Sequence, residues 1–243
     1  MLSCKNHVIV APFLKKPPND KESKIIKIAR ILCLFLLFYF PCSITAENGS
    51  FPPTVSRQFW EIPKKALPAV VTIETQDSVG SGFFIRNDGY IMTNSHLLEN
   101  ASSIQVITYN RLIFPAQIVS LDLKTDLAVI KIEGSDFPYL TYGNPDELEI
   151  GELVFSIGFD SVEVGIVKDK GIDNTGLFLT EDFIKTNAFI YLGNSGGPLL
   201  NSKGEVVGIN AAAQIDREGN YLGESLAISS KLALEVVAKL RVR

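Results

Sequence analysis

The chain has 243 residues, of which 46% are hydrophobic and 21% are charged, so it can bury a sizeable core. The residues after Ala46 carry 16 Lys and Arg against 25 Asp and Glu, a net charge of −9, which argues against a nucleic-acid-binding protein. They contain one histidine, His96, and no cysteine, which excludes a disulfide, a cysteine metal site and a thiol nucleophile. A histidine-based zinc site is not expected either, and neither a phosphate-binding loop nor a metal-ligand cluster is present, so we expect no cofactor.

The first 46 residues have the pattern of an export signal. Residues 31–40 are ten consecutive apolar residues, and four basic residues precede them between Lys21 and Arg30. Ten helical residues span about 15 Å, against roughly 30 Å for a bilayer core, which favours a signal peptide cleaved after Ala46 over a full membrane span. The alternatives are a retained signal anchor, a start assigned too early, and a buried core strand. We therefore expect an exported protein with a basic leader over 1–46.

Short hydrophobic runs separated by Gly, Pro, Asn or Asp predict strands along the rest of the chain. The runs are 69–74, 82–86, 104–108, 127–132, 153–157, 205–209 and 226–228. Helical spacing of apolar residues is favoured only at 230–240, where Leu232, Val236 and Leu240 recur. Many short strands followed by one helix predict an all-β fold of the barrel type, with a C-terminal helix.

His96 is the candidate general base. It follows a hydrophobic strand pattern and a turn at 87–89. A serine hydroxyl is a weak nucleophile at neutral pH, and an adjacent imidazole can activate it by taking its proton. The alternative is a purely structural histidine.

Asp126 is the candidate carboxylate that orients the imidazole. It stands at the mouth of the apolar run 127–132, where a carboxylate is costly to bury unless hydrogen bonds satisfy it. The alternatives are that Asp126 only caps a turn, or that Asp122, further from the apolar run, has the role.

Ser195 is the candidate nucleophile, in the glycine-rich segment 193–198 (GNSGGP). Glycines on both sides let the backbone come close to a substrate and adopt a positive φ, and Asn194 also tolerates unusual turn conformations. In such a turn the amides of Gly193 and Ser195 can point at one place. We therefore predict that Gly193, Asn194 and Ser195 form the oxyanion site. A structural turn between strands is the alternative.

The order His96, Asp126, Ser195 is that of the chymotrypsin-like proteases and differs from those of α/β-hydrolases and subtilisin. The surrounding segments resemble the HtrA/Deg family of trypsin-fold serine proteases. The matching segments, spread over about 60–235, are 68–73 (PAVVTI), 80–85 (GSGFFI), 88–96 (DGYIMTNSH), 125–129 (TDLAV), 193–199 (GNSGGPL) and 204–210 (GEVVGIN).

This resemblance implies two six-stranded antiparallel β-barrels over 62–243, with a seam near 134–147 and the triad between them. It also implies an acyl-enzyme mechanism on unfolded or damaged exported polypeptides, in the periplasm or on a membrane facing it. The residues placed at the substrate pocket are uncharged, which predicts small or medium aliphatic residues before the cut; they are Ile190, Asn210, Ala211, Ala212, Ala227 and Ile228. The alternative is that Ile190 and Ile228 are only core residues.

Two further expectations concern assembly and the number of domains. Aromatic residues in the N-terminal segment 47–61, namely Phe51, Phe59 and Trp60, could join three copies into a homotrimer, as in many family members, or could pack against their own domain. The chain ends at Arg243, shortly after the predicted helix, so we expect no peptide-binding PDZ domain within it.

Departures from the family pattern leave two other functions open. Asn187 stands where the family usually has aspartate, and Tyr191 replaces the usual asparagine near the nucleophile. These changes suggest a dormant protease fold acting as a chaperone or binding module. A hydrolase of small esters is the second alternative.

Overall fold

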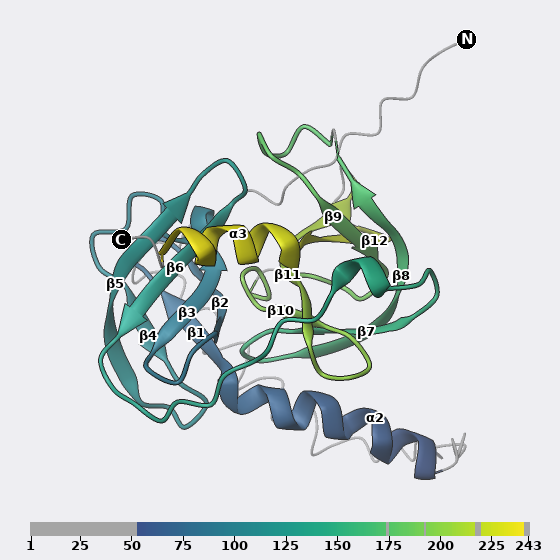
Figure 1. Ribbon diagram of the computed structural model, residues 1–243, viewed down its shortest axis with the longest axis horizontal. Helices are drawn as coiled ribbons and strands as arrows, with labels where there is room; N and C mark the ends of the chain where they lie inside the picture. Colours follow the sequence, from purple (N-terminus) through teal and green to yellow (C-terminus); the bar gives the residue numbers. More distant parts are fainter. Residues whose placement is uncertain (1–52, 174, 192, 217–219, 241–243) are drawn as a thin grey trace, which may run out of the picture.

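The computed structural model describes residues 53–173, 175–191, 193–216 and 220–240. The predicted leader and signal peptide at 1–46, and Phe51, lie outside these residues. Two barrels lie side by side, with one helix crossing the middle of the view and another lying below the barrels (Figure 1).

The first barrel is closed and antiparallel, in the strand order β1-β2-β3-β6-β5-β4. Its interior is a cluster of aliphatic side chains with Phe84. Its strands are β1 (Val70–Glu74), β2 (Val79–Phe84), β3 (Tyr90–Asn94), β4 (Gln105–Ile107), β5 (Ile113–Asp122) and β6 (Leu127–Ile132).

The second barrel is also closed, in the order β10-β11-β12-β9-β8-β7. A separate apolar cluster that includes Val154, Ile184 and Leu199 fills it. Its strands are β7 (Leu153–Ile157), β8 (Val162–Ile172), β9 (Phe183–Thr186), β10 (Pro198–Leu200), β11 (Val206–Ile215) and β12 (Tyr221–Ser229). The predicted pair of six-stranded barrels is thus confirmed, and the seam placed at 134–147 falls between β6 and β7.

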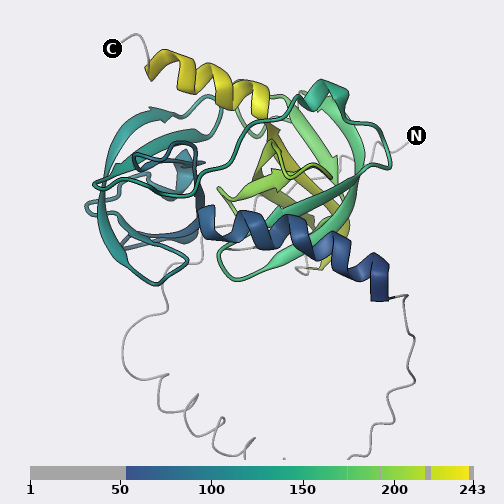
Figure 2. The ribbon, with the colours of Figure 1, turned by 60° about the horizontal axis from the view of Figure 1, so that its bottom comes forward.

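Helix α3 (Ser230–Leu240) has the bounds expected from the sequence and packs on β11 and β12 as well as on β5 and β6. Figure 2 shows it lying along both barrels. Its buried face, Leu232, Ala233 and Val236, belongs to a third apolar cluster with members from both barrels, such as Met92 and Phe155. The helix therefore stabilises the barrels relative to each other.

The expectation of a single, C-terminal helix is wrong. Helix α2 (Pro53–Ala66) precedes β1 and continues into a short 3-10 turn, Leu67–Ala69. Proline is well tolerated in the first turn of a helix, which suits Pro53, whereas Pro63 inside the helix argues against one on sequence alone. Tertiary packing overrides that signal, because Ala66 is buried and Ile62 packs on the cluster shared by the barrels.

Candidate active site

Pairing between β3 and β6 brings His96 and Asp126 together. Asn94, the last residue of β3, is the register partner of Leu127, the first residue of β6. The short 3-10 helix Ser95–Leu97 follows β3 directly, so His96 faces the residue before β6. The Nδ2 of Asn94 and the amide of Ser95 donate to the carbonyl of Asp126 at 2.9 and 3.2 Å. These bonds join the two chain ends on which the predicted base and carboxylate sit.

The Asp126 carboxylate is buried and accepts three hydrogen bonds. Its Oδ2 lies 2.7 Å from Nδ1 of His96, and its Oδ1 accepts from the His96 amide at 2.9 Å and from the Ser95 hydroxyl at 3.0 Å. Asp126 has a φ of +57°, in the left-handed region that aspartate tolerates better than most residues. The carboxylate thus holds both the ring and the backbone of His96.

Asp122, the rival carboxylate, faces elsewhere. It ends β5, where its Oδ1 accepts from the amide of Lys124 at 3.1 Å. Its Oδ2 lies 3.5 Å from Nζ of Lys239 on α3. The geometry therefore favours Asp126 over Asp122 as the partner of His96.

Ser195 lies on two consecutive turns. The amide of Asn194 donates to the carbonyl of Tyr191 at 3.0 Å, and the amide of Gly197 donates to the carbonyl of Asn194 at 2.9 Å. Gly193 and Gly196 occupy the third position of these turns with φ of +104° and +85°, values that favour glycine. A Cβ on Gly196 would stand 2.2 Å from the carbonyl oxygen of Ser81, so the turn rests on backbone of the first barrel.

Strand β11 supports the same turns from the other side. The amide of Gly196 donates to the carbonyl of Asn210, whose own amide donates to the carbonyl of Gly197, both at 2.9 Å. The register of β11 against β12 then shifts between Asn210 and Ala212, as in a β-bulge. The Ser195 hydroxyl donates to the carbonyl of Ala211 within that shift, at 3.4 Å.

The residues predicted for the oxyanion site differ in their hydrogen bonding. Across 193–216 and the other described segments, the amides of Gly193 and Ser195 find no acceptor, whereas the neighbouring amides of Asn194 and Gly196 do. The Asn194 side chain is buried, and its Oδ1 accepts from the Ser161 hydroxyl at 2.9 Å. Two amides beside the candidate nucleophile are therefore available to an incoming oxygen.

The residues predicted for the substrate pocket are almost entirely buried. Ile190 and Ala227 lie in the interior of the second barrel, and Ile228 lies in the cluster shared by both barrels. Asn210 donates from Nδ2 to the carbonyls of Ile157 and Pro198, each at 3.3 Å. Ala211 and Ala212 keep a little surface, 6% and 7%.

An aromatic group lies beside these residues. The ring of Phe189 lies 5.4 Å from that of Tyr191 and 4.4 Å from that of Tyr221. Burial, together with the Glu224 charge, raises the pKa of Tyr221 above its ordinary value, although its hydrogen bond with Ser225 lowers it. Tyr221 is therefore neutral at physiological pH. This group was not expected from the sequence.

Neither a metal site nor a membrane span appears in the described segments. Within them, no three His, Cys, Asp or Glu side chains are grouped as metal ligands. None of the helices the structure describes is both long and apolar enough to cross a bilayer.

Comparison with known proteins places this chain in a family. The model of the trypsin-like peptidase domain matches residues 80–209, which include His96, Asp126 and Ser195. The chain belongs to the trypsin-like peptidase family. The HtrA/Deg resemblance is confirmed by curated relatives named "Probable periplasmic serine endoprotease DegP-like" and by solved HtrA-type structures.

The relatives of this trypsin-like peptidase domain match it over part of their own length. The Chlamydia trachomatis protein is 43% identical over 173 residues, 69% of this chain and 35% of its own. The Ectopseudomonas mendocina protein is 40% identical over 211 residues, 82% of this chain and 44% of its own. The chain thus spans less than half the length of these curated relatives. The solved HtrA-type protease AlgW with tripeptide is 36% identical, with a TM-score of 0.71 over 75% of this chain and 63% of its own.

Proposed function

We propose that the chain is a serine endopeptidase in which Ser195 is the nucleophile, His96 the general base and Asp126 the carboxylate that orients it. The observation that carries the proposal is the buried Asp126 carboxylate, whose Oδ2 lies 2.7 Å from Nδ1 of His96 while Oδ1 accepts from the His96 amide. This arrangement leaves Nε2 as the nitrogen that can accept a proton from a hydroxyl. The names of the relatives and the shared fold support the same function.

In the proposed reaction, the Ser195 hydroxyl passes its proton to Nε2 of His96 as its oxygen bonds to the substrate carbonyl carbon. The carbonyl oxygen takes the negative charge and is held by the amides of Gly193 and Ser195. His96 then gives the proton to the departing amine as the C–N bond breaks. Water repeats the sequence on the acyl-enzyme, with His96 as base again, and releases the acid and free Ser195.

We further propose that the substrates are unfolded or damaged exported polypeptides in the periplasm. The relatives are named as periplasmic serine endoproteases, and HtrA-type structures are described with a tripeptide and a decapeptide. Ala211, whose carbonyl accepts from the Ser195 hydroxyl, and its neighbour Ala212 are uncharged, which supports aliphatic side chains before the cut. A library of unfolded peptides analysed by mass spectrometry tests this preference. Cleavage mainly after charged residues would contradict it.

A homotrimer is proposed for the same protein. Trp60 on α2 has 57% of its surface exposed, which is unusual for a side chain of this size and leaves it available to another copy. Analytical ultracentrifugation at micromolar concentration should show a trimer that is lost in Trp60→Ala. A monomer in the unaltered protein would reject the proposal.

The decisive experiment is fluorophosphonate labelling of the purified protein, with mass spectrometry to locate the adduct. The adduct should form on Ser195 and be absent from Ser195→Ala and His96→Ala, both still folded by circular dichroism. Asp122→Asn is the matched control and should label normally, because Asp122 pairs with Lys239. Labelling that survives His96→Ala would reject His96 as the base.

One observation supports a second function, the dormant chaperone or binding module. The Ser195 hydroxyl donates to the Ala211 carbonyl. In this arrangement its proton is bound by that carbonyl and is not offered to a base. A dormant module predicts client binding that survives Ser195→Ala, with no labelling of the folded unaltered protein.

A further inference from the structure

Ser81, on β2 of the first barrel, makes four hydrogen bonds around the nucleophile turn. Its amide donates to the Ser195 carbonyl at 2.9 Å, and its hydroxyl donates to the Gly193 carbonyl at 2.5 Å. The same hydroxyl accepts from the Phe159 amide at 3.0 Å, and the Ser81 carbonyl accepts from the Thr93 hydroxyl at 2.7 Å. Ser81 is completely buried, so water does not compete for these bonds.

These bonds fall on alternate peptide groups of the turn. The 193–194 peptide is held at its carbonyl by Ser81 and at its amide by the Tyr191 carbonyl. The 195–196 peptide is held at its carbonyl by Ser81 and at its amide by Asn210. The peptide groups before each of them carry the amides of Gly193 and Ser195, which have no acceptor in the described part of the chain. Because each peptide group is planar, holding one group limits the rotation of its neighbours.

We propose that Ser81 is a positioning residue that holds the amides of Gly193 and Ser195 in the orientation needed to bind the oxyanion. This proposal rests on the proposed function and deepens it. Gly193 needs such a support because a glycine at a φ of +104° has no Cβ to restrict its rotation. The hydroxyl of Ser81 supplies the restriction from outside the turn, and its bond to Phe159 fixes the direction of the hydroxyl itself.

The test compares Ser81→Ala with Ser156→Ala. Ser156 is also a completely buried serine on a strand, but its hydroxyl has no partner among the described residues, so its loss is a matched control. Ser81→Ala should lower kcat on a peptide substrate by about 10- to 100-fold with little change in KM, somewhat less than the loss of an oxyanion donor itself. Affinity for a peptide aldehyde, whose adduct carries an oxyanion, should fall in parallel. Affinity for a non-covalent peptide inhibitor should stay the same.

Two further measurements keep the result interpretable. Amide hydrogen exchange in segment 191–197 should rise in Ser81→Ala and stay unchanged in Ser156→Ala, whether or not the protein is an active protease. Ser81→Thr, which keeps a hydroxyl on the same carbon, should recover part of kcat. If Ser81→Ala does not fold, Ser81→Cys takes its place, because a thiol is close in size and a weak donor.

The outcomes separate the two proposals. Failure of fluorophosphonate to label the unaltered protein would reject the protease function, and the exchange measurement would still decide the role of Ser81. Normal kcat, normal aldehyde affinity and normal exchange in folded Ser81→Ala would overturn the inference while leaving the protease function standing.

Discussion

At the scale of single residues, the site depends on a carboxylate whose two oxygens have different partners. Oδ2 of Asp126 faces the imidazole, while Oδ1 holds the amide of His96 and the hydroxyl of Ser95. A buried carboxylate is costly unless such bonds satisfy it. Orientation of the ring and burial of the charge are therefore two results of the same contacts.

Asp126→Asn should remove most activity without unfolding the protein. An amide in place of the carboxylate cannot satisfy both the ring nitrogen and the donors on Oδ1, so His96 adopts the wrong tautomer. We expect kcat to fall by about 10⁴. Asp122→Asn, which changes the rival carboxylate, should leave kcat within a few-fold of the unaltered value. Steady-state kinetics on one peptide measures both, and an equal loss in the two variants would refute the assignment.

Gly196→Ala tests the close contact beneath the nucleophile turn. The added methyl would stand 2.2 Å from the Ser81 carbonyl oxygen and 2.3 Å from Oγ1 of Thr93, at a φ of +85°. Gly151→Ala is the matched control, because Gly151 has a similar φ of +91° with nothing within 4 Å. The control should lose about 1–2 kcal/mol of unfolding free energy from its backbone conformation alone. Gly196→Ala should lose about 4 kcal/mol or more.

Urea denaturation measures both variants. Equal losses would show that backbone conformation alone, and not the contact with Ser81, constrains Gly196.

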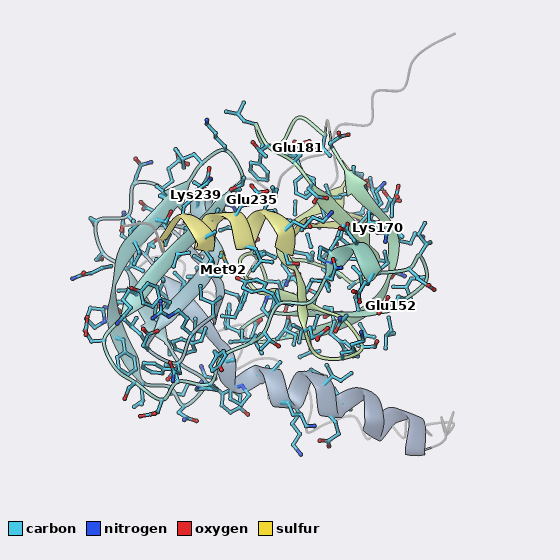
Figure 3. All side chains as sticks on the ribbon, in the orientation of Figure 1. Met92, Glu152, Lys170, Glu181, Glu235 and Lys239 are labelled. Atoms are coloured by element: carbon cyan, nitrogen blue, oxygen red, sulfur yellow. The ribbon has the colours of Figure 1, made fainter. Side chains whose placement is uncertain are left out.

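At the scale of elements, the connection between β8 and β9 is organised by one carboxylate. Glu181, at the edge of the second barrel (Figure 3), accepts from the hydroxyl of Thr175 and the amides of Leu177 and Phe178 on Oε1. The amide of Thr180 in the same connection donates to the Lys124 carbonyl at 2.9 Å, two residues before Asp126. The carboxylate thus orders a segment that contacts the loop carrying Asp126.

This connection should make stability depend on pH. Burial raises the pKa of Glu181, but the hydrogen bonds from Phe178, Thr175 and Leu177 outweigh it and hold the pKa below its ordinary value. A lowered pKa in the folded state stabilises the protein above the ordinary carboxyl range, and that stabilisation disappears as pH falls through the lowered value. Unaltered protein should therefore be more stable than Glu181→Gln near neutral pH, with the difference shrinking towards zero in acid.

Denaturant unfolding at a series of pH values measures that difference. Glu149→Gln, at an exposed carboxylate outside the connection, is the control and should show no such trend. A difference that stays constant into acid would contradict the role given to Glu181.

Sequence patterns predicted some elements and residues better than others. The runs 127–132, 153–157 and 230–240 were predicted with the bounds of β6, β7 and α3, because turn residues mark where they begin or end. Helix α2 is not predicted because Pro63 argues against a helix on sequence alone, whereas in the fold Ile62 and Ala66 pack on the cluster shared by the barrels. The motif 80–85 contains Ser81 but predicts no role for it, because its partners at Gly193 and Phe159 are backbone atoms more than seventy residues away, which no local spacing reveals.

At the scale of the whole molecule, the two barrels share one of their three apolar clusters. It contains Phe83 and Leu127 from the first barrel, Ile157 and Ile209 from the second, and one face of α3. His96 and Asp126 belong to one barrel and Ser195 to the other, so the shared cluster also sets the distance between the proposed base and nucleophile. Loosening it should affect stability and activity together.

Leu232 and Leu234 provide a matched test of that coupling, because they are the same residue type on the same helix. Leu232 is 7% exposed in the shared cluster, while Leu234 is 45% exposed. Leu232→Ala should lower the unfolding free energy by about 2–5 kcal/mol, and Leu234→Ala should change it by no more than about 0.5 kcal/mol. Because the cluster joins both barrels, urea should unfold each variant in a single transition, with fluorescence and circular dichroism changing together. Two separate transitions in the unaltered protein would show that the barrels fold independently, and the shared cluster could then not be what sets the position of His96 relative to Ser195.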